Sequence, residues 1–105
     1  TQKKIQNIYE KAICLVICSK YEGFPNVAIE SIFSGTPVLA YKGIGGIKEL
    51  IDEGKNGILV SKYNVKSYIY GLNILVRKTF NRKIINKTSY KFMKKNTINF
   101  YNNIF

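Results

Sequence analysis

The stretch AICLVICSKYEGFPNVAIESIFSGTPVLAY, residues 12–41, decides the fold of this chain. It opens on a short uninterrupted apolar run, residues 12–18, of the kind found in strands that are buried on both faces of a parallel sheet. Pro25 stands where the first turn of a helix tolerates proline, and the helical pattern that follows stops at Gly35. Residues 36–41 then resume strand character. A strand, a helix and a strand in this order predict a parallel βαβ unit with a right-handed crossover.

Strands and helices continue to alternate after this unit and then give way to helices alone. Apolar residues recur at helical spacing up to Arg77, and a break near Asn81 precedes one or two further helices. We therefore predict an α/β fold, in which residues 1–76 form a partial Rossmann-like parallel sheet of about three strands and residues 77–105 a C-terminal helical segment of the same domain. Three strands are few for an open parallel sheet, so further strands are expected upstream. The other expected elements are a helix end at 3–11, a helix at 47–54, a strand at 58–60, a helix at 65–77 and helical structure at 81–105.

The composition excludes several kinds of site. Histidine is absent from the 105 residues, which rules out imidazole metal ligands and Ser-His or Cys-His nucleophile pairs. Cys14 and Cys18 lie inside the first apolar run, where we interpret them as small buried hydrophobic residues without the partners that a zinc site needs. Neither a signal peptide nor a long apolar span is present, so we expect a cytoplasmic location, with the inner face of the cytoplasmic membrane as the alternative.

The chain is strongly basic, with 17 Lys and Arg against 6 Asp and Glu and a formal net charge of +11. The charge is concentrated only between Arg77 and Lys95, at spacings that suit the solvated faces of amphipathic helices. Two interpretations of that segment stay open: a solvated surface, or a peripheral contact with an anionic membrane. Nucleic acid is not an expected partner, because no recognition element for it is recognisable.

Two of the six acidic residues flank a Gly-Phe-Pro-Asn turn after the first strand, where open parallel sheets bind their ligands. Gly23 lets the backbone approach a ligand, and the amides at the helix start suit a phosphate or diphosphate. Glu22 precedes the helix and Glu30 lies about a turn and a half into it, so both can face one groove. Carboxylates accept hydrogen bonds from hydroxyls, and a nucleotide sugar places hydroxyls on either side of a diphosphate. The predicted site consists of Glu22, Gly23, Phe24, Pro25, Asn26, Val27 and Glu30.

Each glutamate also has a simpler interpretation. Glu22 can be a loop charge favourably placed near a helix start, and Glu30 can be an exposed helix residue. Taken singly, these interpretations are the better ones. Apolar residues surround Glu30 in the sequence, however, so on a covered helix its charge costs free energy unless it is paired or bound to a ligand. The pair is therefore more specific than either residue.

The region that contains this pair resembles the signature region of retaining GT-B glycosyltransferases of family 4, also called group 1 glycosyltransferases. The resemblance covers residues 19–60 and implies the second half of the C-terminal domain of a GT-B fold. In that fold the donor lies between two Rossmann-like domains, and the acceptor is bound mainly by the N-terminal one, which is missing here. The matching motifs are Glu22 to Glu30 with seven residues between them, the Gly-x-Pro-Val strand entrance at 35–38, the Gly45-Gly46 loop with Glu49, and the Gly-x-x-Gly turn at 54–57 before Leu59-Val60.

The resemblance implies a role for each site residue. Glu22 would be the catalytic glutamate that contacts the hydroxyls of the donor sugar near the reacting carbon, and Glu30 the glutamate that binds the ribose hydroxyls. Gly23, Phe24, Asn26 and Val27 would lie where the backbone meets the sugar and diphosphate. Many family members have a second glycine in place of Pro25, which shapes the turn here and removes one amide donor. No metal or other cofactor is expected, in keeping with the absence of an Asp-x-Asp pair.

Two functional hypotheses follow. The first is the donor-binding part of a retaining glycosyltransferase that moves a sugar from a UDP- or GDP-sugar to a glycan or lipid-linked acceptor, in the synthesis of a cell-surface polysaccharide such as lipopolysaccharide or capsule. The second is a truncated, non-catalytic remnant, or a basic module that binds anionic surfaces. In either case the 105 residues alone are expected to be inactive, because nothing in them is evidently able to present the acceptor.

Overall fold

The computed structural model of the chain describes residues 3–4, 12–20 and 26–90. Within this part, strands and helices alternate up to the third strand, and two helices follow. None of the described helices is long and apolar enough to cross a membrane. The elements are β1 (Leu15–Val16), α2 (Asn26–Phe33), β2 (Val38–Tyr41), α3 (Ile47–Leu50), β3 (Gly57–Val60), α4 (Val65–Arg77) and α5 (Arg82–Thr88).

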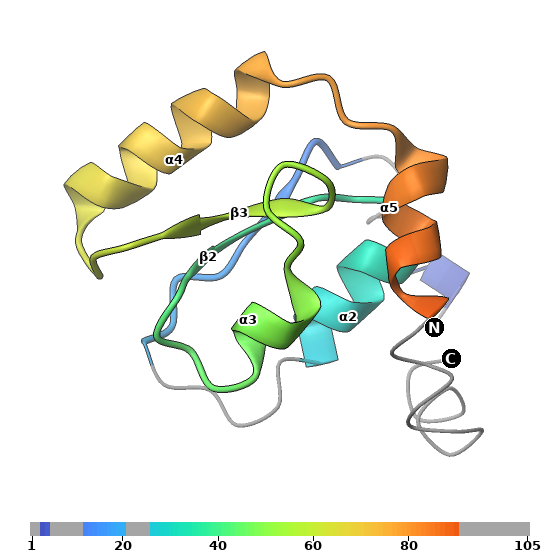
Figure 1. Cartoon of the computed structure of the whole chain (residues 1–105), viewed down its shortest axis with the longest axis horizontal. Coiled ribbons are helices and arrows are strands. Elements are labelled where there is room, and N and C mark those ends of the chain that lie inside the picture. Colours follow the sequence, from blue (N-terminus) through green and yellow to red (C-terminus); the bar gives the residue numbers. More distant parts are fainter. Residues whose placement is uncertain (1–2, 5–11, 21–25, 91–105) are drawn as a thin grey trace.

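The three strands form one parallel sheet in the order β1-β2-β3. Leu15 is in register with Val38, which is in register with Gly57 on the other side. Helix α4 packs on one face of β2 and β3, whereas α2 and α3 lie on the opposite face (Figure 1). The predicted α/β class with a partial Rossmann-like sheet is confirmed.

The larger part of the core lies between the sheet and helices α2, α3 and α5. Ile29 and Ile32 of α2 are three positions apart and therefore face the same way, toward the sheet. They meet Val38 of β2, Ile47 of α3 and Ile85 of α5, and each of these five side chains is at most 2% exposed. Since α5 contributes a fully buried side chain, it belongs to the same core as the strands.

Arg82 joins α5 to the first βαβ unit. Its Nη1 donates to Thr36 Oγ1 at 3.1 Å and to Gly35 O at 3.4 Å, and its Nη2 donates to Ala12 O at 2.6 Å. The start of the helix is capped by Asn81, whose Oδ1 accepts a hydrogen bond from Ile84 N at 3.1 Å. One guanidinium thus connects the segment before β1, the turn before β2 and the last described helix.

The first strand is shorter and more exposed than predicted. The apolar run at 12–18 gives only Leu15–Val16 as strand, with Val16 39% exposed and Ile13 74% exposed. Cys18 is exposed as well, so its interpretation as a buried residue was wrong, while Cys14 is half-buried. The physical reason is that, among the described strands, β1 pairs with β2 alone, and that α4 packs on β2 and β3.

Helix α3 ends at Leu50, four residues before the predicted end at Gly54. The side chain of Asn56 explains this early end, because it forms hydrogen bonds with the backbone polar groups at the end of the helix. Its Oδ1 accepts from Asp52 N at 2.8 Å, and its Nδ2 donates to Leu50 O at 2.9 Å and to Thr88 Oγ1 at 2.9 Å. Asn56 is fully buried, and all three bonds satisfy groups that would otherwise lose water without compensation.

Glycine is required at both ends of the Gly-x-x-Gly turn, for a different structural reason at each. Gly54 has a φ of 83°, which is in the left-handed region that residues with a Cβ rarely adopt. Gly57 opens β3, where a Cβ would come within 2.3 Å of Val38 O on the neighbouring strand. The turn therefore sets both the direction of the chain and the closeness of β3 to β2.

We expect Gly57→Ala to lower the free energy of unfolding by at least about 2 kcal/mol, because a backbone carbonyl in a paired strand cannot move away from the added methyl group. Urea unfolding measures this effect. Gly45→Ala is the matched control, since Gly45 is exposed and its φ does not lie in the left-handed region. Equal stability of the two variants would contradict the close packing of β3 against β2.

Candidate functional site

The candidate site lies at the carboxyl ends of the parallel strands. Each strand leads there into a connecting segment, at 18–20 after β1, at 42–46 after β2 and at 61–64 after β3. Helix α2 runs antiparallel to the strands as the crossover of the βαβ unit, so its N-terminus opens at the same edge. This edge is where parallel α/β sheets bind their ligands.

Four of the seven predicted site residues, Glu22, Gly23, Phe24 and Pro25, lie outside the described residues. Their roles stay predictions. The other three belong to α2, where Asn26 is the first helical residue and is exposed. Val27 follows it and is 42% exposed. The first amides of a helix have no partner within the helix, so this end of α2 presents N–H donors and the positive end of the helix dipole.

Glu30 lies one turn further along α2 than Asn26. Residues four apart lie on the same face of a helix, so these two polar side chains lead away from the helix start along one line. Glu30 is half-buried between Ile29 and Ser31, which are both at most 1% exposed. The predicted exposed-helix interpretation of Glu30 therefore does not hold, and the structure groups Glu30 with Asn26 and Val27. Chemically, this helix end can accept hydrogen bonds at a carboxylate and donate them from backbone amides.

Three tyrosines form a cluster at the same edge, which was not predicted from the sequence. The ring centroids of Tyr41 and Tyr63 are 5.6 Å apart, and those of Tyr63 and Tyr68 are 6.2 Å apart, both in edge-to-face geometry. The Lys20 ammonium lies 5.8 Å from the centroid of the Tyr63 ring, within the range of a cation–π contact. The tyrosines come from the end of β2, the segment after β3 and α4, so only the folded chain brings them together.

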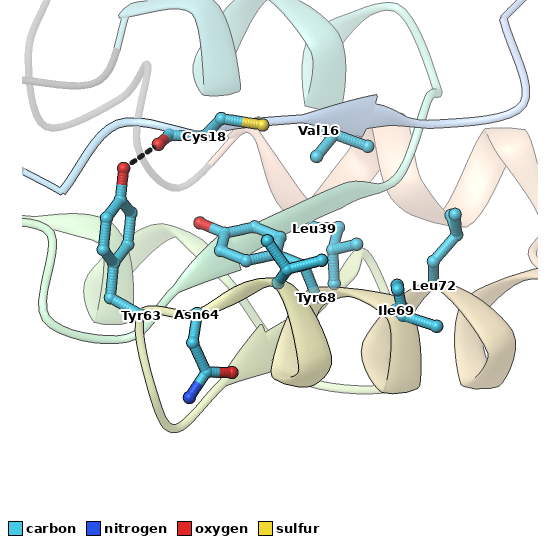
Figure 2. Close-up of a pocket in the computed structure, with 9 residues that line it drawn as sticks. Val16, Cys18, Leu39, Tyr63, Asn64, Tyr68, Ile69 and Leu72 are labelled. Carbon is cyan, nitrogen blue, oxygen red and sulfur yellow. Dashed lines mark hydrogen bonds between the residues drawn. The ribbon is translucent and has the colours of Figure 1, made fainter.

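Two of these tyrosines hold the backbone that leaves β1. The hydroxyl of Tyr68 donates to Ile17 O at 2.6 Å, and that of Tyr63 donates to Cys18 O (Figure 2). Consecutive carbonyls just before the predicted site segment are thus fixed by side chains 45 and 51 positions away in sequence. A tyrosine in the segment after a strand, followed by another five residues later, is the signal that could have suggested this arrangement.

The electrostatic character of this edge is basic. A lysine follows each strand within a few residues: Lys20 after β1, Lys42 after β2 and Lys62 after β3, and all three are exposed. Among the residues that the structure describes, no group of three or more His, Cys, Asp or Glu side chains could hold a metal ion. The edge therefore offers positive charge and amide donors together with the carboxylate of Glu30.

Comparison with known proteins identifies the family. The sequence profile described as "Glycosyl transferases group 1" matches residues 1–92. The chain belongs to this family. The group 1 family implies a nucleotide-sugar donor and an acceptor.

Curated relatives agree with this assignment. An uncharacterized glycosyltransferase of Methanocaldococcus jannaschii is 34% identical, over 92% of this chain and 27% of its own length. A D-inositol 3-phosphate glycosyltransferase of Nocardiopsis dassonvillei is 34% identical, over 72% of this chain and 18% of its own. A GalNAc-alpha-(1->4)-GalNAc-alpha-(1->3)-diNAcBac-PP-undecaprenol alpha-1,4-N-acetyl-D-galactosaminyltransferase of Campylobacter jejuni is 36% identical, over 55% of this chain and 16% of its own. The chain spans roughly a quarter or less of the length of these relatives.

The tyrosine cluster gives a prediction about pH. Burial raises the pKa of Tyr68, the nearby Cys18 raises it further, and a hydrogen bond with the backbone of Tyr41 lowers it in part. Because the folded state holds the proton more tightly than the unfolded state, this contribution to stability is complete below the ordinary tyrosine pKa of about 10 and is lost as the pH rises through the folded pKa.

We expect Tyr68→Phe to lower the free energy of unfolding by about 1 kcal/mol at neutral pH, because the hydrogen bond to Ile17 O is lost. The same variant should lose less stability than the unsubstituted chain as the pH rises above about 10, the ordinary tyrosine pKa. Urea unfolding across that range measures both effects. Tyr70→Phe is the control, since Tyr70 is 69% exposed. An identical pH dependence in all three proteins would contradict a raised pKa of Tyr68 as the cause.

Proposed function

We propose that this domain is the donor-binding part of a retaining glycosyltransferase, which transfers a sugar from a UDP- or GDP-sugar to a glycan or lipid-linked acceptor in the synthesis of a cell-surface polysaccharide such as lipopolysaccharide or capsule. The observation that carries the proposal is the family match over residues 1–92, because it includes the whole stretch from Glu22 to Glu30. The rest of the proposal concerns how the donor is held.

In the proposed complex the donor extends along the start of α2. The ribose hydroxyls donate to Glu30, whose half-buried position limits competition from water. The diphosphate lies at the N-terminal amides of α2, where the helix dipole favours negative charge. Lys20, Lys42 and Lys62 lie at the same edge and add a field that attracts the diphosphate. The sugar then lies toward Glu22, which the resemblance assigns to its hydroxyls.

The hydrogen bonds of Tyr63 and Tyr68 support the proposed position of Glu22. They fix the backbone at Ile17 and Cys18, five and four positions before Glu22. A catalytic carboxylate must be held in position by groups that do not themselves react, and a capped backbone at the end of a strand provides such support. In this proposal the tyrosines are positioning residues.

The reaction we propose retains the anomeric configuration of the sugar. The acceptor hydroxyl attacks the anomeric carbon on the face from which the diphosphate departs, the bond from that carbon to the phosphate oxygen breaks, and the departing diphosphate takes the proton of the acceptor. The group 1 resemblance supports this route, and neither a metal nor another cofactor has a role in it. The amides at the start of α2 and the lysines stabilise the charge that develops on the diphosphate.

The name of one relative supports the proposed acceptor class. The Campylobacter jejuni relative is named for sugar transfer to an undecaprenol-linked glycan. A lipid-linked acceptor lies at a membrane, and we propose that the exposed basic side chains of the last described helices contact anionic headgroups there. These side chains are Arg77, Lys78, Lys83 and Lys87.

The second candidate is a non-catalytic remnant or surface-binding module. The observation that favours it is the exposure of the basic side chains Arg77, Lys78, Lys83 and Lys87, which suit an anionic surface. The two candidates differ in what a family-length protein does. By "family-length protein" we mean the longest reading frame that encodes residues 1–105 or, where that frame adds nothing, a chimera in which these residues replace the matched segment of the Methanocaldococcus jannaschii relative.

In the family-length protein, Glu30→Gln should weaken the binding of the nucleotide sugar about 10-fold or more, because an amide replaces a charged acceptor of ribose hydroxyls. Isothermal titration calorimetry with UDP- and GDP-sugars measures the affinity. Glu49→Gln is the control, since Glu49 is an exposed residue of α3. Unchanged affinity in Glu30→Gln would remove the ribose role.

Glu22→Gln in the same protein should lower the rate of sugar transfer by at least about 100-fold with the fold intact, if its carboxylate contacts the sugar at the reacting carbon. Transfer of radiolabelled sugar to lipid extract measures the rate, and circular dichroism checks the fold. Excess EDTA should leave the unsubstituted rate unchanged. Residues 1–105 alone should give no transfer. Full activity in Glu22→Gln would argue for a different catalytic residue, and a family-length protein inactive with every donor would favour the remnant.

A further inference from the structure

A basic pocket of about 540 Å³ lies where helix α5 packs beside the end of α2 (Figure 1). We call it the α2–α5 pocket. Ser34 lines it on the α2 side, and Arg82, Lys83, Asn86 and Lys87 line it on the α5 side. Because α2 ends where β2 begins, the pocket lies at the opposite edge of the sheet from the candidate site at the start of α2. The eight residues of α2 separate the two by about 12 Å.

Positive charge gathers at this pocket without a carboxylate to balance it. Lys83 and Lys87 are four residues apart and therefore lie on one face of α5. Arg82 adds a third positive charge, although three hydrogen bonds already hold its guanidinium in the fold. In the part of the chain that the structure describes, no carboxylate lines the pocket or is ion-paired with either lysine. Like charges at this spacing repel each other, so an anion between the two ammonium groups would relieve the repulsion.

The end of α2 does not cancel this attraction. The last carbonyl groups of a helix together carry about half a negative charge. In α2, however, the carbonyl of Phe33 accepts a hydrogen bond from Asn86 Nδ2. The carbonyl of Ile32 accepts one from Gly35 N at 3.0 Å. Three full positive charges therefore outweigh a partial negative charge that is already directed toward other donors.

The hydroxyl of Ser34 has no hydrogen-bond partner among the described residues, although its Oγ is buried. A buried hydroxyl without a hydrogen bond costs free energy, and such a group in a folded protein often marks the place of a water or an ion. Since no hydrogen bond from a described residue holds this side chain in one rotamer, rotation about χ1 can turn the hydroxyl into the pocket that Ser34 lines. The pocket therefore offers a neutral donor beside its positive charges.

We propose that the α2–α5 pocket binds a phosphate group. The ammonium groups of Lys83 and Lys87 contact its charged oxygens, the hydroxyl of Ser34 donates to one of them, and Arg82 contributes charge while it keeps its structural hydrogen bonds. The pocket is open and larger than a phosphate, so it also admits the group that carries the phosphate. Two sources offer this chemistry, a soluble phosphate ester and the headgroup of an anionic lipid. Only the lipid source rests on the proposed function, through the membrane contact of the last described helices.

Calorimetric titration of the family-length protein with glycerol 3-phosphate tests the soluble source. The double variant Lys83→Gln/Lys87→Gln should weaken binding at least about 10-fold, because two charge-assisted contacts are lost. The matched control is Arg77→Gln/Lys78→Gln, which removes the same charge from exposed residues outside the pocket and should weaken binding less than about 2-fold. Equal weakening by the two double variants would overturn the proposal, since net charge alone would then explain the binding.

Flotation of the same protein with vesicles of phosphatidylcholine and phosphatidic acid tests the lipid source. Here too Lys83→Gln/Lys87→Gln should release more protein than the Arg77→Gln/Lys78→Gln control. Binding that depends on Lys83 and Lys87 supports the proposal in either arm, and the arm that shows it identifies the source. If neither probe binds in a way that depends on these two lysines, the proposal is wrong.

Ser34→Ala distinguishes a phosphate site from general attraction to lysines. In the arm that shows binding, it should weaken the affinity about 3-fold without lowering the midpoint of thermal unfolding, because the hydroxyl that it removes has no partner among the described residues. An unchanged affinity would contradict the proposed site.

The affinity for the nucleotide sugar provides a check that the pocket is separate from the donor site. It should change less than about 2-fold in Lys83→Gln/Lys87→Gln, because the pocket lies at the other end of α2. A loss of nucleotide-sugar affinity as large as the loss of phosphate affinity would make the pocket part of the donor site and overturn the proposal. Because the phosphate probes are measured without a sugar donor, the pocket and the proposed function can fail or succeed independently.

Discussion

The positions of the other strands and helices depend on strand β2, because among the described strands it alone is paired on both sides. Its residues Val38, Leu39 and Ala40 are at most 1% exposed. Its register fixes β1 and β3, its two faces receive α2 and α4, and its carboxyl end contributes Tyr41 to the tyrosine cluster. The close contact at Gly57 and the hydrogen bonds of Arg82 around the turn before β2 serve to keep this strand in place.

The sequence predicts those features that local pattern determines. Apolar runs and helical spacing identified the βαβ unit, and the apolar residues that recur at helical spacing from Val65 through Arg77 gave the bounds of α4. The end of α3 was missed because it depends on Asn56, which bonds to Thr88 far along the chain. The exposure of Cys18 was missed because burial depends on neighbours, and a run of apolar letters does not show whether a sheet ends beside it.

The site shows the same division. The helix face that carries Asn26 and Glu30 follows from spacing within one helix, so sequence could predict it. The tyrosine cluster comes from three separate elements and is defined by contacts between them, which no local pattern encodes. The sequence predicts Asn26 and Glu30, the part of the site that is proposed to bind the ligand. The supporting tyrosines can be identified only in the folded structure, because they come from distant segments.

The role of Asn56 also bears on how the protein ages. An asparagine followed by glycine, as in Asn56-Gly57, is the sequence most prone to spontaneous deamidation, which begins when the glycine nitrogen attacks the side-chain amide. In the folded chain both ends of that amide are held, with its oxygen bonded to Asp52 N and its nitrogen bonded to Leu50 O and Thr88 Oγ1. Folding therefore protects the Asn56 side-chain amide from this attack. A chain that deamidates while it is unfolded loses the Asn56 amide donor, which bonds to the end of α3 and to α5. Deamidation before folding therefore hinders folding itself.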